Sequence, residues 1–381
     1  MSIFTPSEIM RRWDLVRDHL GESECAVVPS FHNSYYLSGF PMIQWGRWAI
    51  TVLFRDHDPV LTIPGFEASG ASAHSPIRDV RLYRDDDGPS SMRTATEHAI
   101  AAIRQRRCRV IGIEGRGMPA AMYVQLSTAF PDAVFRDVTD AIEEARIASS
   151  AEEIAYLREA SKVADAGMKA ILEQMRPGTS ESLLCADAHL VMARAVSDGL
   201  EAHTNCYMQQ GERSAQCHRG STSAPIERGQ IVEIVCESEI WHYQAAIERC
   251  VLVGSASEKV ERAYRVMLDA FKTAKETVRP GVRFADVDAA ARRILLDAGY
   301  ENITTGTGLV RNILHHTGGR IEFGNLRPRN DRTLLPGMVL TIEPWAVVAG
   351  VGGPRHCDMV LVTGEGHEAL SRVEAGLLRV P

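Results

Sequence analysis

The stretch LPGMVLTIEP, residues 335–344, is the part of the sequence that most constrains the fold. A Pro-Gly pair marks a turn, and the apolar run after it predicts a strand over residues 338–343 that ends in Glu343. The sequence RHCD, residues 355–358, leads into a second apolar run and predicts another strand over residues 358–362. The C-terminal part of the chain is therefore expected to contain a β-sheet.

Two pairs of long helices are predicted ahead of these strands. An RPG sequence separates the two helices of each pair, because proline and glycine together end a helix. The first pair spans residues 152–174 and 180–198, and the second spans residues 259–278 and 284–298. Two apolar strands are predicted between the pairs, within residues 229–252. The recurrence predicts an internal repeat of helix pairs that flank an antiparallel sheet.

Residues 1–148 alternate between predicted helices and strands, the pattern of an α/β domain with a mixed sheet. Helices are predicted at residues 6–20, 92–107, 119–130 and 140–146, and strands at residues 25–28, 49–54, 59–64 and 109–113. The polar sequence RDHD, residues 55–58, separates two of these apolar strands and indicates a hairpin.

Composition excludes several classes of protein. The 381 residues carry 42 Lys and Arg against 49 Asp and Glu, and a net charge of −7 argues against nucleic acid as a main partner. No apolar run approaches the roughly 18–20 residues of a membrane span, and the N-terminus lacks the apolar core of a signal peptide. The eight cysteines form no C-x-x-C pair, so we expect reduced, buried thiols. These features predict a cytoplasmic protein without membrane or nucleic-acid partners.

The helix-start sequence SSAEE at residues 149–153, the two helix pairs, residues 335–344 and residues 355–358 together resemble the creatinase/aminopeptidase P/methionine aminopeptidase family, peptidase family M24. The resemblance covers nearly the whole chain. It implies an α+β fold in which residues 149–381 form a pita-bread catalytic domain, a curved antiparallel sheet with flanking helix pairs. Residues 1–148 would form a smaller N-terminal α/β creatinase-like domain.

Most members of that family hold two metal ions with two Asp, one His and two Glu side chains. The resemblance places those five positions at Val235, Ala246, Leu309, Glu343 and Cys357. Two divalent cations need several oxygen ligands to offset their charge, and one carboxylate with one thiol does not supply them. We therefore expect no metal and no cofactor.

Creatinase, the branch of the family that has no metal, also lacks the family's full set of metal ligands. The sequences AIER at residues 246–249, GR at residues 319–320 and WGR at residues 45–47 resemble creatinase segments. The resemblance implies three catalytic residues, His218, Glu248 and Glu343. It implies six substrate-binding residues, which are Arg47, Trp45, Arg320, Tyr243, Cys357 and Leu309.

These residue types suit a small zwitterionic substrate. Two carboxylates can hold a guanidinium or amidinium group, two arginines can hold a carboxylate, and a histidine can move protons near neutral pH. The resulting prediction is a metal-independent, creatinase-like amidinohydrolase that cleaves a C–N bond in a small carboxylate-bearing guanidine or amidine, or a related ectoine-type hydrolase.

Two alternatives remain open. The first is a metal-dependent Xaa-Pro aminopeptidase or dipeptidase, for which Glu233, Glu237 and Glu239 would form a carboxylate patch, since alternate residues of a strand share one face. The second is a catalytically inactive family member that binds a small ligand. The family resemblance also implies a homodimer, in which Arg47 and Trp45 would complete the pocket of the partner.

Overall fold

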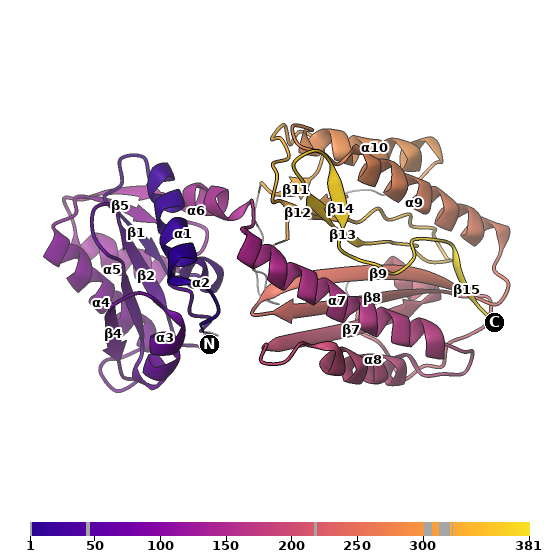
Figure 1. Cartoon of the computed structure of the whole chain (residues 1–381), viewed down its shortest axis with the longest axis horizontal. Coiled ribbons are helices and arrows are strands. Elements are labelled where there is room, and N and C mark those ends of the chain that lie inside the picture. The colour runs from indigo at the N-terminus through magenta and orange to yellow at the C-terminus, as the bar shows by residue number, and fades with distance from the viewer. Residues whose placement is uncertain (1, 43–45, 217–218, 301–306, 312–320, 322) are drawn as a thin grey trace. The chain divides into compact units, whose positions relative to one another are not determined.

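The computed structural model describes residues 2–42, 46–216, 219–300, 307–311, 321 and 323–381 (Figure 1). The chain divides into two compact units, of which the first contains Met1–Ile147 and the second begins at Ala148. No helix in the described part of the chain is both long and apolar enough to cross a membrane.

The first unit is built on a six-stranded mixed sheet in the order β4-β3-β2-β1-β5-β6. Its strands are β1 (Cys25–Val28), β2 (Ile50–Phe54), β3 (Val60–Pro64), β4 (Asp79–Tyr83), β5 (Val110–Ile113) and β6 (Val134–Asp137). Its helices are α1 (Pro6–His19), α2 (Phe31–Ser38), α3 (Ala68–His74), α4 (Ser91–Arg106), α5 (Ala120–Ala129) and α6 (Thr139–Arg146). The predicted hairpin is confirmed, because β2 and β3 are adjacent antiparallel strands.

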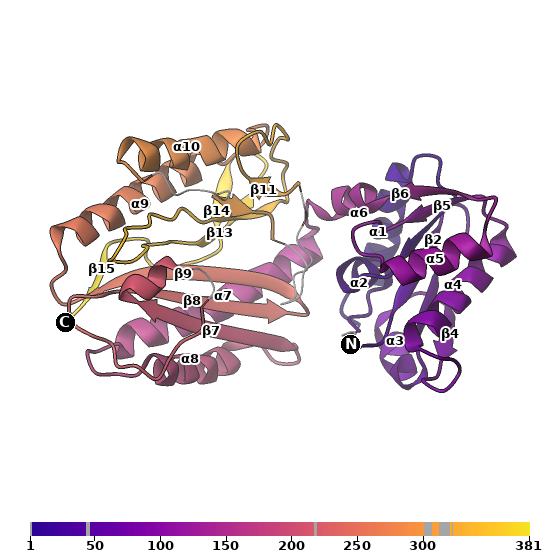
Figure 2. The ribbon, with the colours of Figure 1, turned by 180° about the vertical axis from the view of Figure 1, so that it is seen from behind.

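Helices cover both faces of this sheet. Figure 1 shows α1 and α2 on one side, and Figure 2 shows α4 and α5 on the other. The residues of β1 and β2 are all buried, as expected for strands enclosed by two helical layers. The predicted α/β character of this unit is therefore confirmed.

Among its described residues, the second unit contains two main sheets and four long helices. Its helices are α7 (Ala151–Gln174), α8 (Glu181–Ala195), α9 (Glu258–Thr277) and α10 (Phe284–Asp297). One sheet has the order β15-β9-β8-β7, with β7 (Ala202–Gln210), β8 (Ile231–Ile240), β9 (Tyr243–Val253) and β15 (Leu378–Val380). The other has the order β12-β13-β14, with β12 (Val339–Ile342), β13 (Asp358–Val362) and β14 (His367–Ala369). A short pair consists of β10 (Gly308–Leu309) and β11 (Asn325–Leu326).

The internal repeat is visible in the turn that joins the two helices of each pair. Gly178, between α7 and α8, has φ +90° and donates its N–H to the carbonyl of Ile226. Gly281, between α9 and α10, has φ +81° and donates its N–H to the carbonyl of Leu334. A positive φ favours glycine, so the recurring RPG has the same structural reason in both halves.

Helix α7 begins where the sequence predicts. The hydroxyl of Ser150 accepts a hydrogen bond from the N–H of Glu153, and the Glu153 carboxylate accepts one from the N–H of Ser150. This reciprocal capping box fixes the first turn of the helix that lies along the main sheet.

The two faces of the β7-β8-β9 sheet have different roles. Ser238 on β8 donates its hydroxyl hydrogen to the carbonyl of Ala160 on α7, which shows which face α7 covers. Cys206 on β7 and Cys236 on β8 share that outer face with Cys185 on α8, and the Cys185 and Cys206 sulfurs are 3.3 Å apart. Residues of opposite parity lie on the other, inner face. The predicted buried thiols are confirmed for six of the seven cysteines that the structure describes, Cys108 being partly buried.

Candidate functional site

Three of the predicted site residues come together on the inner face of the main sheet. Glu248 on β9 forms a backbone bridge with Cys357, with N–H···O distances of 3.1 and 3.2 Å. The Cys357 sulfur lies 3.8 Å from Oε1 of Glu343, the residue that follows β12. The middle of β9, the residue after β12 and the residue before β13 therefore place two glutamates and a thiol in one cluster.

Arg355 contacts two carboxyl groups of this cluster. Its Nη2 lies 2.6 Å from Oε1 of Glu233 on β8, and its Nε lies 2.7 Å from Oε2 of Glu248. All three side chains are buried, where a carboxylate without a partner is costly. Glu233 was expected on this face from the two-residue period of the strand, whereas Arg355 was not recognised.

Arg311, whose side chain is 12% exposed, is the second cation of the cluster. Its Nη2 lies 3.3 Å from Oε1 of Glu343, and its Nη1 donates a 2.6 Å hydrogen bond to the side-chain oxygen of Gln244 on β9. Sequence reasoning missed this residue too. The spacing in the sequence was a signal for both arginines. Arg311 lies two residues after Leu309, and Arg355 lies two residues before Cys357. Alternate residues of an extended segment point to the same side, so the spacing could have placed each arginine beside a predicted site residue.

Burial separates the acidities of the two glutamates. Desolvation raises the pKa of Glu248 to about 8, although the Arg355 charge opposes this effect. Desolvation also disfavours ionised Glu343, but the guanidinium of Arg311 and a hydrogen bond from Thr341 hold the pKa of Glu343 below its ordinary value. At neutral pH Glu248 is therefore a carboxylic acid and Glu343 a carboxylate. Burial and the nearby charge of Glu343 raise the pKa of the Cys357 thiol, which stays protonated.

Two other predicted substrate-binding residues have structural contacts. The Tyr243 hydroxyl donates a 2.8 Å hydrogen bond to Oε1 of Glu153 on α7, which places this side chain on the outer face, away from Glu248. This placement does not support the predicted substrate contact. Leu309 lies on β10, and its backbone N–H donates to the hydroxyl of Thr341 at 3.2 Å.

Arg47 is the only predicted site residue that the structure describes in the first unit. It forms an exposed ion pair with Asp85, with 2.5 Å between Nη2 and Oδ2, and lies over the ring of Phe66. The remaining predicted residues, His218, Trp45 and Arg320, lie outside the described residues. The predicted homodimer, with Arg47 serving the partner, stays a prediction.

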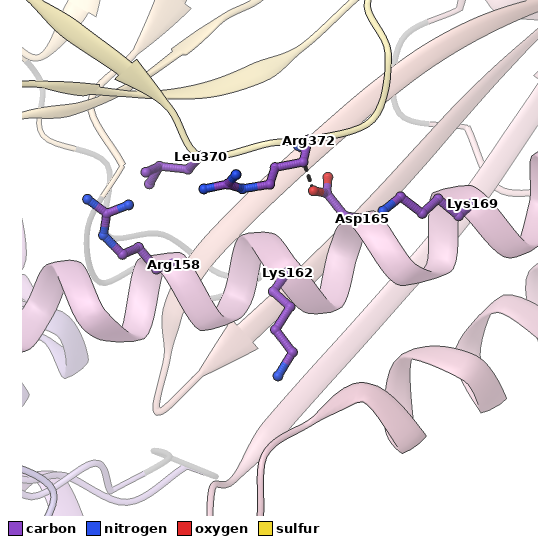
Figure 3. A pocket seen from close by; sticks show the side chains of 6 residues that line it. All are labelled: Arg158, Lys162, Asp165, Lys169, Leu370 and Arg372. Atoms are coloured by element: carbon purple, nitrogen blue, oxygen red, sulfur yellow. Dashed lines mark hydrogen bonds between the residues drawn. The ribbon is translucent and has the colours of Figure 1, made fainter.

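A cavity of about 290 Å³ lies along α7, apart from this cluster (Figure 3). Its lining is mainly basic and consists of Arg158, Lys162, Asp165, Lys169, Leu370 and Arg372. The Asp165 carboxylate accepts a 2.6 Å hydrogen bond from the backbone N–H of Arg372. Burial raises the pKa of Asp165 to about 6.

Asp165 is expected to make stability fall as the pH rises. Its pKa in the folded chain lies above the value of about 3.9 for an unfolded aspartate, so the stabilisation is present below pH 4 and is lost as the pH rises through about 6. Asp165→Asn keeps an oxygen acceptor for Arg372 and should raise the free energy of unfolding at pH 7.5 by up to about 3 kcal/mol. Urea unfolding from pH 4 to 8 measures this, with the exposed Asp187→Asn as control. Superimposable pH curves for Asp165→Asn and the unmodified chain would refute it.

Comparison with known proteins identifies relatives over more than nine tenths of the chain. Residues 155–364 match metallopeptidase family M24, and residues 12–148 match the creatinase/prolidase N-terminal domain. The chain is 28% identical to an Xaa-Pro dipeptidase of Pyrococcus horikoshii over 357 residues, 93% of this chain and 94% of that protein. It is 28% identical to an Xaa-Pro dipeptidase of Pyrococcus furiosus over 348 residues, 91% of this chain and 92% of that protein.

The solved structures agree. The prolidase of P. horikoshii superimposes with a TM-score of 0.82 at 25% identity, covering 98% of this chain and all of that one. The predicted two-domain α+β pita-bread architecture is therefore confirmed.

The predicted function is wrong. The relatives are Xaa-Pro dipeptidases of a metallopeptidase family, which contradicts a creatinase-like amidinohydrolase and the metal independence inferred from the creatinase branch. The cause of the error is local. A few residues around Glu248 and Arg320 resemble creatinase, whereas the similarity of the whole chain is to dipeptidases.

The residues present do not fit the pair of metal ions that the family implies. Val235 and Ala246 are apolar and buried. In the pairing of β8 with β9, Val235 lies opposite Glu248 and Ala246 lies opposite Glu237. Within the described residues, no three ligand-type side chains of this cluster bring their donor atoms within 4.8 Å of one another. The carboxylates that are present pair with guanidinium groups instead, so the cluster already has its counter-charges.

Proposed function

Because the chain belongs to metallopeptidase family M24, we propose that it hydrolyses the peptide bond of short peptides, with Xaa-Pro dipeptides as the substrate class. The observation that carries this proposal is similarity to Xaa-Pro dipeptidases across both units, over 93% of the chain. The inner-face cluster supports it, since it holds a proton donor and a proton acceptor in a buried place.

The two glutamates suit the two proton transfers of amide hydrolysis. Glu343, ionised at neutral pH, accepts a proton from water as the water oxygen bonds to the carbonyl carbon. Glu248, protonated below about pH 8, gives its proton to the amide nitrogen as the C–N bond breaks. The guanidinium charge of Arg311 beside Glu343 favours negative charge on the carbonyl oxygen during the reaction.

Mass spectrometry of Ala-Pro and Leu-Pro digests tests the proposal. We expect release of free proline by the unmodified chain, and a fall in kcat of about 10²–10⁴-fold for Glu343→Gln, because the proton acceptor is lost. The exposed Glu365→Gln serves as the matched control and should keep full activity. Absence of proline release by the folded chain, with and without added Mn²⁺, Co²⁺ or Zn²⁺, would refute the proposal.

A second candidate function is binding of such a ligand without turnover. The specific observation in its favour is that Glu233, Glu248 and Glu343 each contact a guanidinium group, so the donor set does not fit the metals of the family. Calorimetric titration with the same dipeptides separates the two candidates. Saturable binding without proline release would favour this second function.

A further inference from the structure

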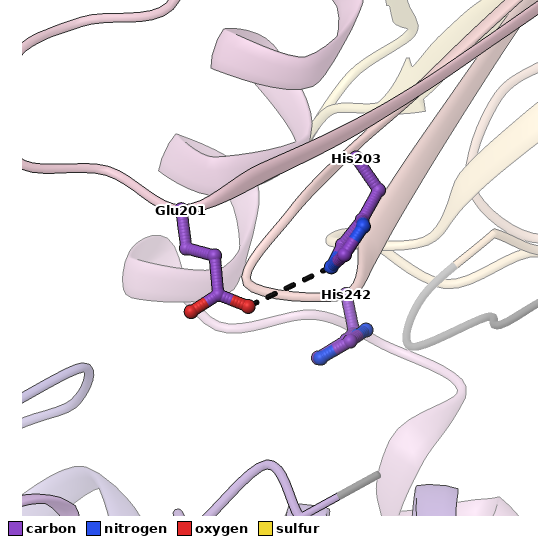
Figure 4. Close-up of side chains that lie close together, drawn as sticks. All are labelled: Glu201, His203 and His242. Atoms are coloured by element: carbon purple, nitrogen blue, oxygen red, sulfur yellow. Dashed lines mark ion pairs between the residues drawn. The ribbon is translucent and has the colours of Figure 1, made fainter.

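A second group of polar side chains lies at the end of the main sheet (Figure 4). Glu201 directly precedes β7, His203 lies on β7, and His242 lies in the turn between β8 and β9. One potential ligand atom from each lies within 4.8 Å of the other two, and within the described residues no other group of three meets this condition. Oε1 of Glu201 is 3.6 Å from Nε2 of His203, and the two imidazole rings are stacked with centroids 5.6 Å apart.

The backbone holds these residues together. Trp241 and His242 form a two-residue hairpin turn with φ of 48° and 64°, a conformation that non-glycine residues adopt at a cost. The N–H of Trp241 donates a 3.1 Å hydrogen bond to the carbonyl of Glu201, which ties the start of β7 to the turn. Strand pairing places His203 opposite Glu239. The convergence is therefore built into the sheet and does not depend on flexible side chains alone.

Glu239 provides an independent indication of a cation. Its side chain is only 3% exposed, and its Oε2 lies 3.4 Å from Nδ1 of His242 while accepting no hydrogen bond within the described part of the chain. A histidine that binds a metal through one ring nitrogen commonly faces a carboxylate with the other. A buried carboxylate also requires a positive charge nearby, which a cation on His242 would supply.

We propose that Glu201, His203 and His242 form a site for one divalent cation of the zinc class, with Glu239 orienting His242. Two imidazoles and a carboxylate suit Zn²⁺, Co²⁺ or Ni²⁺, whereas Mg²⁺ and Ca²⁺ prefer oxygen ligands alone. Zinc needs ligand atoms about 2.0–2.2 Å from the ion. The three ligand atoms must therefore move closer together through small rotations of their side chains. Glu201 and His203 are about half exposed and have room for it. A water molecule would complete the tetrahedron.

Calorimetric titration of the EDTA-treated full chain with Zn²⁺ tests the site. We expect one tight equivalent, and at least a tenfold loss of affinity for His203→Ala, for His242→Ala and for Glu239→Gln. His57→Ala, which removes an exposed histidine of the first unit, is the matched control. Because His203 is 46% exposed, its removal should leave the fold intact, and circular dichroism checks this.

The result of the zinc titration does not depend on the proposed peptidase activity. Glu343→Gln should keep zinc affinity unchanged, since Glu343 belongs to the other cluster. Cobalt absorption bands of a tetrahedral site, lost in His203→Ala, would further support the assignment. Equal zinc affinity of His203→Ala and the unmodified chain, or loss of zinc affinity in Glu343→Gln, would overturn it.

Discussion

Arg355→Met should lower the free energy of unfolding by about 3–5 kcal/mol, because it leaves the Glu233 carboxylate buried without its guanidinium partner and removes the guanidinium that contacts Glu248. Methionine retains much of the side-chain volume, so the loss of stability reflects the missing charge more than lost packing. Urea unfolding measured at pH 7 gives the change directly. The exposed Arg93→Met, whose pair with Glu97 lies at the surface, should cost no more than about 1 kcal/mol.

A double substitution distinguishes the electrostatic cause from a general packing defect. Glu233→Gln combined with Arg355→Met removes one buried charge of each sign, so the double variant should be more stable than Arg355→Met alone. If the two losses simply add, Arg355 stabilises the fold through its packing and the proposed charge balance is incorrect.

The second large effect is expected in the pH dependence of peptide hydrolysis. Glu248 has a pKa of about 8 and acts as the proton donor, so kcat/KM should be high on the acidic side of pH 8 and fall as the pH rises through it. Glu248→Gln should lower kcat/KM at pH 7 by about 10²–10⁴-fold and remove this fall. The exposed Glu227→Gln is the control. A constant kcat/KM from pH 7 to 9 in the unmodified chain would exclude Glu248 as the proton donor.

Most of the architecture was predictable from local patterns. Helix α7 follows from the capping residues Ser150 and Glu153, and the ends of the helix pairs follow from the two RPG sequences. Strand β7 was missed because its sequence, AHTNCYMQQ, is too polar to show apolar alternation. His203, Asn205 and Gln209 have the parity of the inner face, where Asn205 donates a hydrogen bond to Glu237, whereas Thr204 contacts His189 on α8.

The site was predictable only in part. The family resemblance brought Glu248, Glu343 and Cys357 to one cluster, and the structure places them together. The two arginines were not recognised, because a guanidinium reaches these carboxylates only when distant segments meet in the folded chain. The substrate was assigned wrongly because short motifs show where polar groups lie, whereas the similarity over the whole chain carries the information about the reaction.

The thiols on the outer face have a consequence for the chemical lifetime of the protein. Cys185 and Cys206 lie 3.3 Å apart, and the hydrogen bond between them, together with burial, raises the pKa of Cys185. A protonated, enclosed thiol reacts slowly with oxidants and alkylating reagents. Modification of these cysteines requires α8 to separate from β7. The rate at which iodoacetamide modifies them therefore measures how often α8 separates from the sheet.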